Sequence, residues 1–168
     1  MAIILITGGT RSGKSVRAEM RARDFAGKPV YIATAEALDA EMRERIARHR
    51  ARRGSDWLER ETPLELVAAL RETDGGGARL VDCLTLWLSN LLHAGRDWAK
   101  EAESLADALA RQKSPVVLVT NEVGLGIVPD NALARQFRDA SGILNQTIAR
   151  AADEVEFMVA GLPMRVKS

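Results

Sequence analysis

Short apolar runs alternate with longer amphipathic segments along almost the whole chain. The runs are rich in β-branched residues and are bounded by glycine, proline or polar residues, which is the pattern of buried strands. They predict strands at Ile3–Thr7, Val30–Ala33, Arg79–Cys83, Pro115–Val119 and Val155–Val159. We expect Val155–Val159 to be the last strand.

The segments between these runs have apolar residues at helical spacing. They predict helices at Lys14–Phe25, Asp39–Arg53, Leu84–Leu92, Trp98–Gln112 and Asn131–Ala152, and one from Pro63 through Leu70. Gly54 and Ser55 are expected to end the helix over 39–53, and Asp74–Ala78 to form a loop. Strands alternating with helices predict an α/β fold whose mostly parallel sheet has helices on both faces and binds ligands at the carboxyl ends of its strands.

Composition narrows the class of protein. The chain has 168 residues, 46% of them hydrophobic, which suits a single domain over residues 1–168 with a real core. A net charge of +1 argues against a protein that coats nucleic acid. The single cysteine, Cys83, excludes an internal disulfide. Without a signal-peptide pattern or an apolar run of about 18 residues, we expect a cytoplasmic protein that has no membrane partner.

The first predicted strand runs into a glycine-rich loop. Gly8, four further residues and then Gly13, Lys14 and Ser15 match the GxxxxGK[ST] pattern. In such a loop, backbone N–H groups wrap nucleotide phosphates, the lysine reaches the outer phosphates and the hydroxyl can bind magnesium. The alternative is a glycine-rich turn that binds no ligand, but the strand and helix that a phosphate loop requires flank this one.

A phosphate loop also needs an acidic residue at the end of a nearby buried strand to hold magnesium through water. Asp82 is in that position, at the end of the strand over 79–83. It could equally cap the helix that begins at Leu84, since aspartate is a common cap. Both roles stay open at this point.

Two histidines occur in the chain. On the helix over 39–53, His49 shares a face with Arg45 and Arg53, and these positive neighbours disfavour imidazolium. A neutral imidazole near a triphosphate is a nucleophile for phosphorus, and guanidinium groups could neutralise the leaving pyrophosphate. The alternative is a solvated basic helix with an incidental histidine. His93, in an apolar setting near a helix end, is expected to cap or pack.

Four stretches carry a resemblance to a known family: ITGGTRSGKS, YIATAEALDAEMRERIARHRARR with the following W-x-x-x-E, VDCLTLWLSNLL, and VVLVTNEVGLGIVPDNALARQFRDASGILNQTIARAADEV. They span nearly the whole chain, and the last is far more specific than a phosphate loop. The chain resembles the bifunctional adenosylcobinamide kinase and adenosylcobinamide-phosphate guanylyltransferase family of cobalamin biosynthesis.

The resemblance implies two reactions. The enzyme would phosphorylate adenosylcobinamide with ATP or GTP, and then transfer GMP from GTP to the new phosphate through a guanylylated histidine. The family's I-x-x-H-[RK] stretch falls on Ile46 to Arg50, which places that histidine at His49. A RecA-like P-loop fold and a homotrimer are implied as well. Mg²⁺ is expected from the phosphate loop, and the near-neutral charge predicts no nucleic acid as partner.

The family's functional positions can be matched to this sequence. Catalysis is assigned to His49 and Lys14, and magnesium to Ser15 and Asp82. The nucleotide-binding residues would be Gly8, Gly9, Thr10, Arg11, Ser12, Gly13, Lys14, Ser15, Ala33, Thr34, Ala35, Arg50, Ala51, Arg52, Arg53, Glu61 and Asp82.

Other interpretations remain at this stage. Glu122, just past an apolar strand, is a candidate base for the kinase reaction, but it could instead hold the following loop. The protein could be a P-loop kinase of another small metabolite, in which His49 forms no covalent nucleotide. A GTP-dependent switch is disfavoured because the N-K-x-D guanine motif is absent. A nucleic-acid-binding module on Arg43 to Arg53 is disfavoured by the near-neutral charge.

Overall fold

The structure is a computed structural model of the chain. It describes residues 1–36 and 40–168, and within helix α2 it describes five residues, Glu41, Met42, Arg45, His49 and Arg52, by their backbone alone. The predicted start of that helix at Asp39 therefore lies outside the described residues. Among the described residues, no helix combines the length and apolar character that crossing a bilayer requires.

One seven-stranded sheet runs through the described part of the chain, in the order β3-β2-β4-β5-β1-β6-β7. All neighbours are parallel except β6 and β7. The strands are β1 (Ile3–Gly8), β2 (Val30–Ala33), β3 (Leu58–Glu61), β4 (Arg79–Asp82), β5 (Val116–Val119), β6 (Glu154–Val159) and β7 (Leu162–Lys167).

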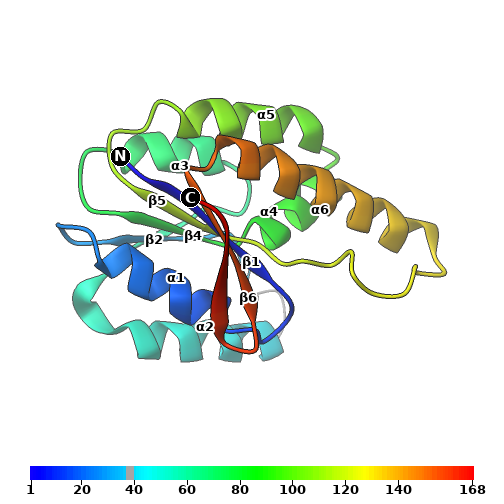
Figure 1. Cartoon of the computed structure of the whole chain (residues 1–168), viewed down its shortest axis with the longest axis horizontal. Coiled ribbons are helices and arrows are strands. Elements are labelled where there is room, and N and C mark those ends of the chain that lie inside the picture. The colour runs from blue at the N-terminus through cyan, green and yellow to red at the C-terminus, as the bar shows by residue number, and fades with distance from the viewer. Residues whose placement is uncertain (37–39) are drawn as a thin grey trace.

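Helices cover both faces of this sheet, with α1 and α2 on one side and α3 to α6 on the other (Figure 1). They are α1 (Lys14–Arg23), α2 (Ala40–Arg53), α3 (Leu66–Glu72), α4 (Leu84–His93), α5 (Trp98–Leu109) and α6 (Ala132–Ala151), and a 3₁₀ turn, η1 (Gly54–Asp56), follows α2. The predicted α/β fold with a mostly parallel sheet is confirmed.

Alternation along each strand builds the two halves of the core. In β1, Ile3 and Leu5 pack against α3 to α6, whereas Ile4 and Ile6 pack against the α1 side. Each of these side chains is at most 2% exposed. A strand buried on both faces must be apolar at every position, which is why these strands read as continuous hydrophobic runs.

Two strands were not predicted. β3 has exposed residues at all four positions, so it has no apolar run to mark it. The expectation that Val155–Val159 is the last strand is wrong, because Leu162–Lys167 forms β7 and pairs antiparallel with β6. β7 is exposed along its length and lies at the sheet edge, so it has no apolar run of the kind that marks a buried strand.

Helix ends also differ from the predictions. The helix expected from Pro63 begins only at Leu66, because the amide of Leu66 donates to the carbonyl of Leu64 in a tight turn. The helices expected to reach Phe25 and Gln112 end at Arg23 and Leu109. Gly54 ends α2 as predicted, with a φ of 72° that favours glycine.

A buried ion-pair group clamps α1 to β6. The carboxylate of Glu156 is 2% exposed and accepts two hydrogen bonds of 2.7 Å from Arg17 and one of 2.6 Å from Arg21. The hydrogen bonds from Arg17, followed by those from Arg21, hold the pKa of Glu156 below its ordinary value of 4.5. Because α1 begins at Lys14, this clamp also sets the position of the phosphate loop.

We expect Glu156→Gln to lower the free energy of unfolding at pH 7 by about 2–3 kcal/mol, since it leaves two guanidinium groups without their buried partner. The pKa of Glu156 is lower in the folded than in the unfolded protein, so its contribution is present above pH 4.5 and is lost as the pH falls through the folded value. The difference between wild type and variant should therefore shrink in acid.

Chemical denaturation at several pH values measures both effects. Glu154→Gln is the matched control, because Glu154 is 27% exposed and accepts only one hydrogen bond from Arg21. It should cost less than about 1 kcal/mol. Equal losses in the two variants would contradict the proposed clamp.

Candidate functional site

The glycine-rich loop connects β1 to α1 as the sequence predicts. Gly13 is the N-cap of α1 and has a φ of 94°, and a Cβ there would lie 3.2 Å from the Cα of Gly161. At Gly8, a Cβ would lie 2.7 Å from the carbonyl oxygen of Met158, closer than real Cβ contacts allow. Both positions therefore require glycine, because the β6–β7 hairpin packs directly against the loop.

Lys14 lies inside this loop. It is buried, and its Nζ donates to the carbonyl of Gly9 and lies 3.5 Å from Oγ of Ser12. The carbonyl of Ser12 accepts from the amide of Gly161 at 3.1 Å, so the turn of the β6–β7 hairpin braces the loop from outside. The ammonium group is thus held where the loop backbone encloses it, as a phosphate-binding lysine must be.

The register of the sheet brings further predicted residues to the same edge. Asp82 pairs with Val119, which pairs with Ile6 of β1, and on its other side Asp82 pairs with Ala33 of β2. Ala33 in turn pairs with Glu61 of β3. Directly paired residues project from the same face, so this row faces the α1 and α2 side.

Asp82 does not cap the following helix. The N-cap of α4 is Cys83, which makes no side-chain capping hydrogen bond, so the capping interpretation of Asp82 is wrong. Instead, Oδ2 of Asp82 accepts a hydrogen bond of 2.9 Å from the hydroxyl of Tyr31. The carboxylate is only partly buried and lies at the carboxyl end of β4.

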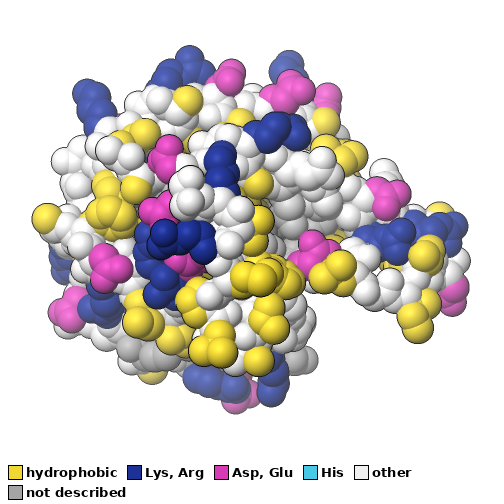
Figure 2. All heavy atoms as spheres, viewed as in Figure 1, with side chains coloured by type: hydrophobic (Ala, Val, Ile, Leu, Met, Phe, Trp, Pro, Cys, Tyr) yellow, Lys and Arg dark blue, Asp and Glu magenta, His cyan; other side chains and the backbone are white. Residues whose placement is uncertain are grey.

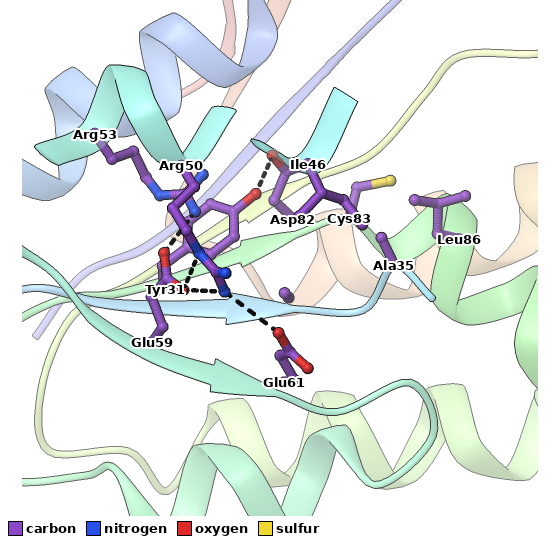
Figure 3. Close-up of a pocket in the computed structure, with 11 residues that line it drawn as sticks. Tyr31, Ala35, Ile46, Arg50, Arg53, Glu59, Glu61, Asp82, Cys83 and Leu86 are labelled. Carbon is purple, nitrogen blue, oxygen red and sulfur yellow. Dashed lines mark hydrogen bonds and ion pairs between the residues drawn. The ribbon is translucent and has the colours of Figure 1, made fainter. Parts of the chain in front are cut away.

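A pocket lies between α2 and strands β2, β3 and β4 (Figure 3). Its lining residues are Tyr31, Ala33, Ala35, Ile46, Arg50, Arg53, Glu59, Glu61, Asp82, Cys83 and Leu86. Six of them were predicted from the sequence: Ala33, Ala35, Arg50, Arg53, Glu61 and Asp82. A second, adjoining hollow shares Ala35, Ile46, Arg50 and Glu61, and extends to Arg43 and Pro63.

Two arginines of α2 form ion pairs with the glutamates of β3 in this pocket. Arg50 donates to Glu59 at 2.7 Å and to Glu61 at 3.4 Å, and Arg53 donates to Glu59 at 2.9 Å. The hydrogen bond from Arg50 is the main cause that keeps the pKa of Glu59 below its ordinary value. Arg53 is 4% exposed, and its Nε and Nη1 find no hydrogen-bond partner among the described residues.

Other predicted residues do not line this pocket. Thr34 is fully buried and fixes the end of β4: its Oγ1 donates to the carbonyl of Cys83 at 2.7 Å and accepts from the amide of Cys83 at 2.9 Å. Thr10, Arg11 and Ala51 are exposed, and the side chains of His49 and Arg52 lie outside the described part.

His93 and Glu122 have local partners. Nδ1 of the exposed His93 lies 2.8 Å from the carbonyl of Ser89, one turn back in α4, whereas the C-cap residue of this helix is Ala94. A carboxylate oxygen of Glu122 accepts from the amide of Gly124, and the amide of Glu122 donates to the carbonyl of Gly8 at 3.0 Å. These contacts are those of the loop-holding role that the sequence left open, and they tie the loop to the phosphate loop.

Five residues that line the pocket were not predicted as site residues from the sequence: Tyr31, Ile46, Glu59, Cys83 and Leu86. Glu59 lies within the W-x-x-x-E stretch, two residues before Glu61. Residues two apart on a strand project from the same face, so recognising β3 would have placed Glu59 beside the predicted Glu61. Burial, and then the nearby Asp82, raises the pKa of the Cys83 thiol to about 11. The thiol is therefore protonated at neutral pH and is not a competing nucleophile.

Comparison with known proteins identifies the family. Residues 4–166 match the model of a family described as cobinamide kinase / cobinamide phosphate guanyltransferase. The chain belongs to this family. A bifunctional adenosylcobalamin biosynthesis protein CobP of Pseudomonas aeruginosa is 49% identical over 97% of this chain and 96% of that protein. The protein CobU of Salmonella typhimurium, named for the same function, is 43% identical over 98% of this chain and 99% of its own length.

Solved structures agree with the fold. A flagellar accessory protein FlaH from Methanocaldococcus jannaschii superposes with a TM-score of 0.56 at 13% identity, covering 99% of this chain and 78% of that one. An ATPase of a bacterial type III secretion system reaches 0.58 at 13% identity, covering 98% of this chain and 56% of that one. At such low identity these likenesses show the P-loop NTPase fold alone.

For the cobinamide kinase / guanyltransferase chain, the donor set suits magnesium. Among the described residues, no group of three or more histidine, cysteine or acidic side chains could hold a metal by itself. Mg²⁺ usually keeps several waters and takes one or two protein ligands besides nucleotide phosphates. The Ser15 hydroxyl and the Asp82 carboxylate are groups of this kind, and the hydrogen bond that Asp82 accepts from Tyr31 among the described residues goes to Oδ2.

We expect the two pocket arginines to differ in their effect on stability. Arg53→Ala should lower the free energy of unfolding by about 2–3 kcal/mol, because it removes a buried guanidinium that bonds Glu59 and lies 3.4 Å over the Tyr31 ring. Arg50→Ala should cost less than about 1 kcal/mol, since its side chain is 55% exposed. Chemical denaturation of both variants decides this, and a larger loss for Arg50→Ala would contradict the described packing of α2.

Proposed function

We propose that the chain catalyses both reactions of its family. It phosphorylates adenosylcobinamide with ATP or GTP, and it then transfers GMP from GTP through a guanylylated His49 to give adenosylcobinamide-GDP. The observation that carries the proposal is the edge of the sheet, where the phosphate loop and a pocket beneath the His49 helix both lie at carboxyl ends of parallel strands. Ligands of such folds bind at that edge.

The kinase reaction is assigned to the phosphate loop. Loop N–H groups and the buried Lys14 would neutralise the triphosphate, so that the γ-phosphorus is presented in line to the aminopropanol hydroxyl of adenosylcobinamide. The hydroxyl oxygen forms the new bond to phosphorus, the bond to the β,γ-bridging oxygen breaks, and the nucleoside diphosphate leaves. The hydroxyl proton passes to solvent or to a base that we leave unassigned.

The guanylyl reaction is assigned to α2. With about 3.6 residues per turn, the position of His49 falls on the helix face that carries Ile46, Arg50 and Arg53, and those three residues line the pocket. Two guanidinium groups on this face would offset the charge of a triphosphate that enters the pocket. Burial and the nearby Asp82 raise the pKa of the Cys83 thiol, so this protonated thiol would not compete with an imidazole.

Bond changes in this reaction balance over two displacements. A nitrogen of neutral His49 attacks the α-phosphorus of GTP, and the bond to the α,β-bridging oxygen breaks to release pyrophosphate. The product is a phosphoramidate. A phosphate oxygen of adenosylcobinamide phosphate then attacks the same phosphorus, the P–N bond breaks, and His49 returns to its starting state. Protonation of the nitrogen makes it a good leaving group.

Magnesium would be held by Ser15 and Asp82 together with nucleotide phosphates and water. When bound, Mg²⁺ offsets the charge that develops on phosphate oxygens during transfer. The chain's own part is to present one hydroxyl and one carboxylate at fixed positions. Thr34 contributes by holding the backbone at the end of β4, where Asp82 lies.

We further propose that the enzyme acts in the cytoplasm as the homotrimer that the family resemblance implies. Exposed apolar residues support self-association: Leu125, Ile127 and Val128 lie in the loop after β5, and Leu162, Met164 and Val166 lie on β7. Figure 2 shows hydrophobic side chains on the projecting end of the molecule near the start of α6 and around the β6–β7 hairpin. Apolar surface of this kind marks contact sites.

The proposal is tested by incubating the protein with Mg²⁺ and GTP labelled at the α-phosphorus. We expect wild type to acquire covalent label that acid removes and alkali does not, as a histidine phosphoramidate requires. His49→Ala should acquire none, because it lacks the imidazole nitrogen that forms the phosphoramidate, yet it should still transfer the γ-phosphate to adenosylcobinamide.

His93→Ala is the matched control, since it removes the chain's other histidine from an exposed helix end. It should label as wild type does. An unlabelled wild type that still transfers γ-phosphate would leave a kinase alone and refute the guanylyl half of the proposal.

A further inference from the structure

Cationic and aromatic side chains form a continuous stack under the pocket. The guanidinium of Arg53 lies 3.4 Å from the centroid of the Tyr31 ring, and the Tyr31 and Trp57 rings meet edge to face at 6.2 Å. The guanidinium of Arg23 lies 5.4 Å over Trp57. The stack joins α1, α2 and β2, and Tyr31 lies at its centre.

The hydroxyl of Tyr31 contacts the carboxylate of Asp82, which is the carboxylate proposed to bind magnesium. It donates to Oδ2 of Asp82 at 2.9 Å (Figure 3). The geometry follows from the sheet: Tyr31 pairs with Leu80, so Asp82, two residues further along β4, projects from the same face. Tyr31 is 7% exposed, so its ring is held by packing against its neighbours.

A phenylalanine would supply the same ring to the stack, so packing alone does not account for the hydroxyl. What the hydroxyl adds is control over a carboxylate. The last torsion of an aspartate side chain is broad and roughly two-fold, so an unsupported carboxylate rotates freely about it. A hydrogen bond to Oδ2 from a rigid donor fixes that torsion and leaves Oδ1 directed elsewhere.

We propose that Tyr31 is a positioning residue for the transfer reactions, whose hydroxyl holds Asp82 in the orientation that receives the hydrated magnesium of the bound nucleotide. The inference rests on the role of Asp82 proposed above. Groups that orient metal ligands in this way contribute strongly to metal affinity in other proteins. Because Arg53 belongs to the helix that carries His49, the same stack links that helix to the metal carboxylate.

Burial offers a competing explanation, in which the Tyr31 hydroxyl takes the nearest acceptor and Asp82 gains nothing from it. On that view, removing the hydroxyl changes stability but not metal binding. A readout of metal binding therefore separates the two explanations, whereas an assay of activity alone would not.

The experiment compares Tyr31→Phe with wild type by calorimetric titration of GDP, with and without Mg²⁺. We expect GDP affinity without metal to stay within about twofold, and the gain in affinity that Mg²⁺ confers to fall about 10-fold. The Mg²⁺ concentration for half-maximal γ-phosphate transfer should rise by a similar factor, while kcat at saturating Mg²⁺ stays within about threefold. An unchanged Mg²⁺ dependence in Tyr31→Phe overturns the inference.

Three further variants sharpen the comparison. Thr73→Val removes a hydroxyl that bonds only backbone carbonyls at the end of α3, and it should match wild type throughout. Asp82→Asn should abolish the gain from Mg²⁺, and adding Tyr31→Phe to it should change nothing more, because Tyr31 acts through Asp82. If Asp82→Asn still binds GDP more tightly with Mg²⁺, the metal role proposed for Asp82 is wrong. If Asp82→Asn loses this increase in affinity while Tyr31→Phe keeps it, only the positioning role of Tyr31 is wrong.

A second measurement avoids substitution at Tyr31. Tyr31 is the only tyrosine of the chain, so growth on 3-fluorotyrosine places a single ¹⁹F probe on this ring. In the GDP-saturated protein, adding Mg²⁺ should shift the ¹⁹F resonance, and the shift should vanish in Asp82→Asn. A resonance indifferent to Mg²⁺ in the otherwise unchanged protein would contradict the link between the ring and the metal site.

Discussion

Burial of a parallel sheet on both faces is the constraint on which the rest of the structure depends. Because helices cover each face, polar groups can meet a ligand only where the strands end. Parallel order puts those carboxyl ends together, so the phosphate loop after β1, Asp82 at the end of β4 and the loop after β5 share one edge. A reaction that needs several of these groups at once must occur there.

Along that edge, the register decides which side chains face the same helices. The row from Ile6 through Val119 to Asp82, Ala33 and Glu61 begins in the core and ends in the pocket. The α1 and α2 side of the sheet is therefore apolar at Ile6 and Val119 and carries carboxylates at Asp82 and Glu61. This change in chemistry along one face distinguishes the phosphate-loop region from the pocket that carries Arg50 and Arg53.

Much of this arrangement could be predicted from the sequence, because buried strands and the phosphate loop impose strong patterns. Gly8 follows one apolar run and Asp82 ends another. These two patterns were sufficient to place the phosphate loop and Asp82 at the carboxyl ends of the strands, where ligands bind. β3 and β7 could not be predicted in this way, since both are exposed edge strands that carry no continuous apolar run. Glu59 was missed together with β3.

Other features depend on contacts between distant segments. Tyr31 looks like one more apolar residue of a buried strand, and only the pairing of β2 with β4 reveals that its hydroxyl reaches Asp82. The N-cap of α4 is Cys83, which decided against Asp82 as a helix cap. The contact of Gly161 with the phosphate loop likewise joins residues about 150 positions apart, which no local pattern records.

We propose that one chain adds two groups in sequence to the same acceptor at this edge. The decisive experiment supplies adenosylcobinamide with Mg²⁺ and GTP that carries one isotope at the α-phosphorus and another at the γ-phosphorus. We expect the acceptor to gain the γ label first and the final product to contain both labels. A product that contains only one of them, with adenosylcobinamide fully consumed, would contradict it.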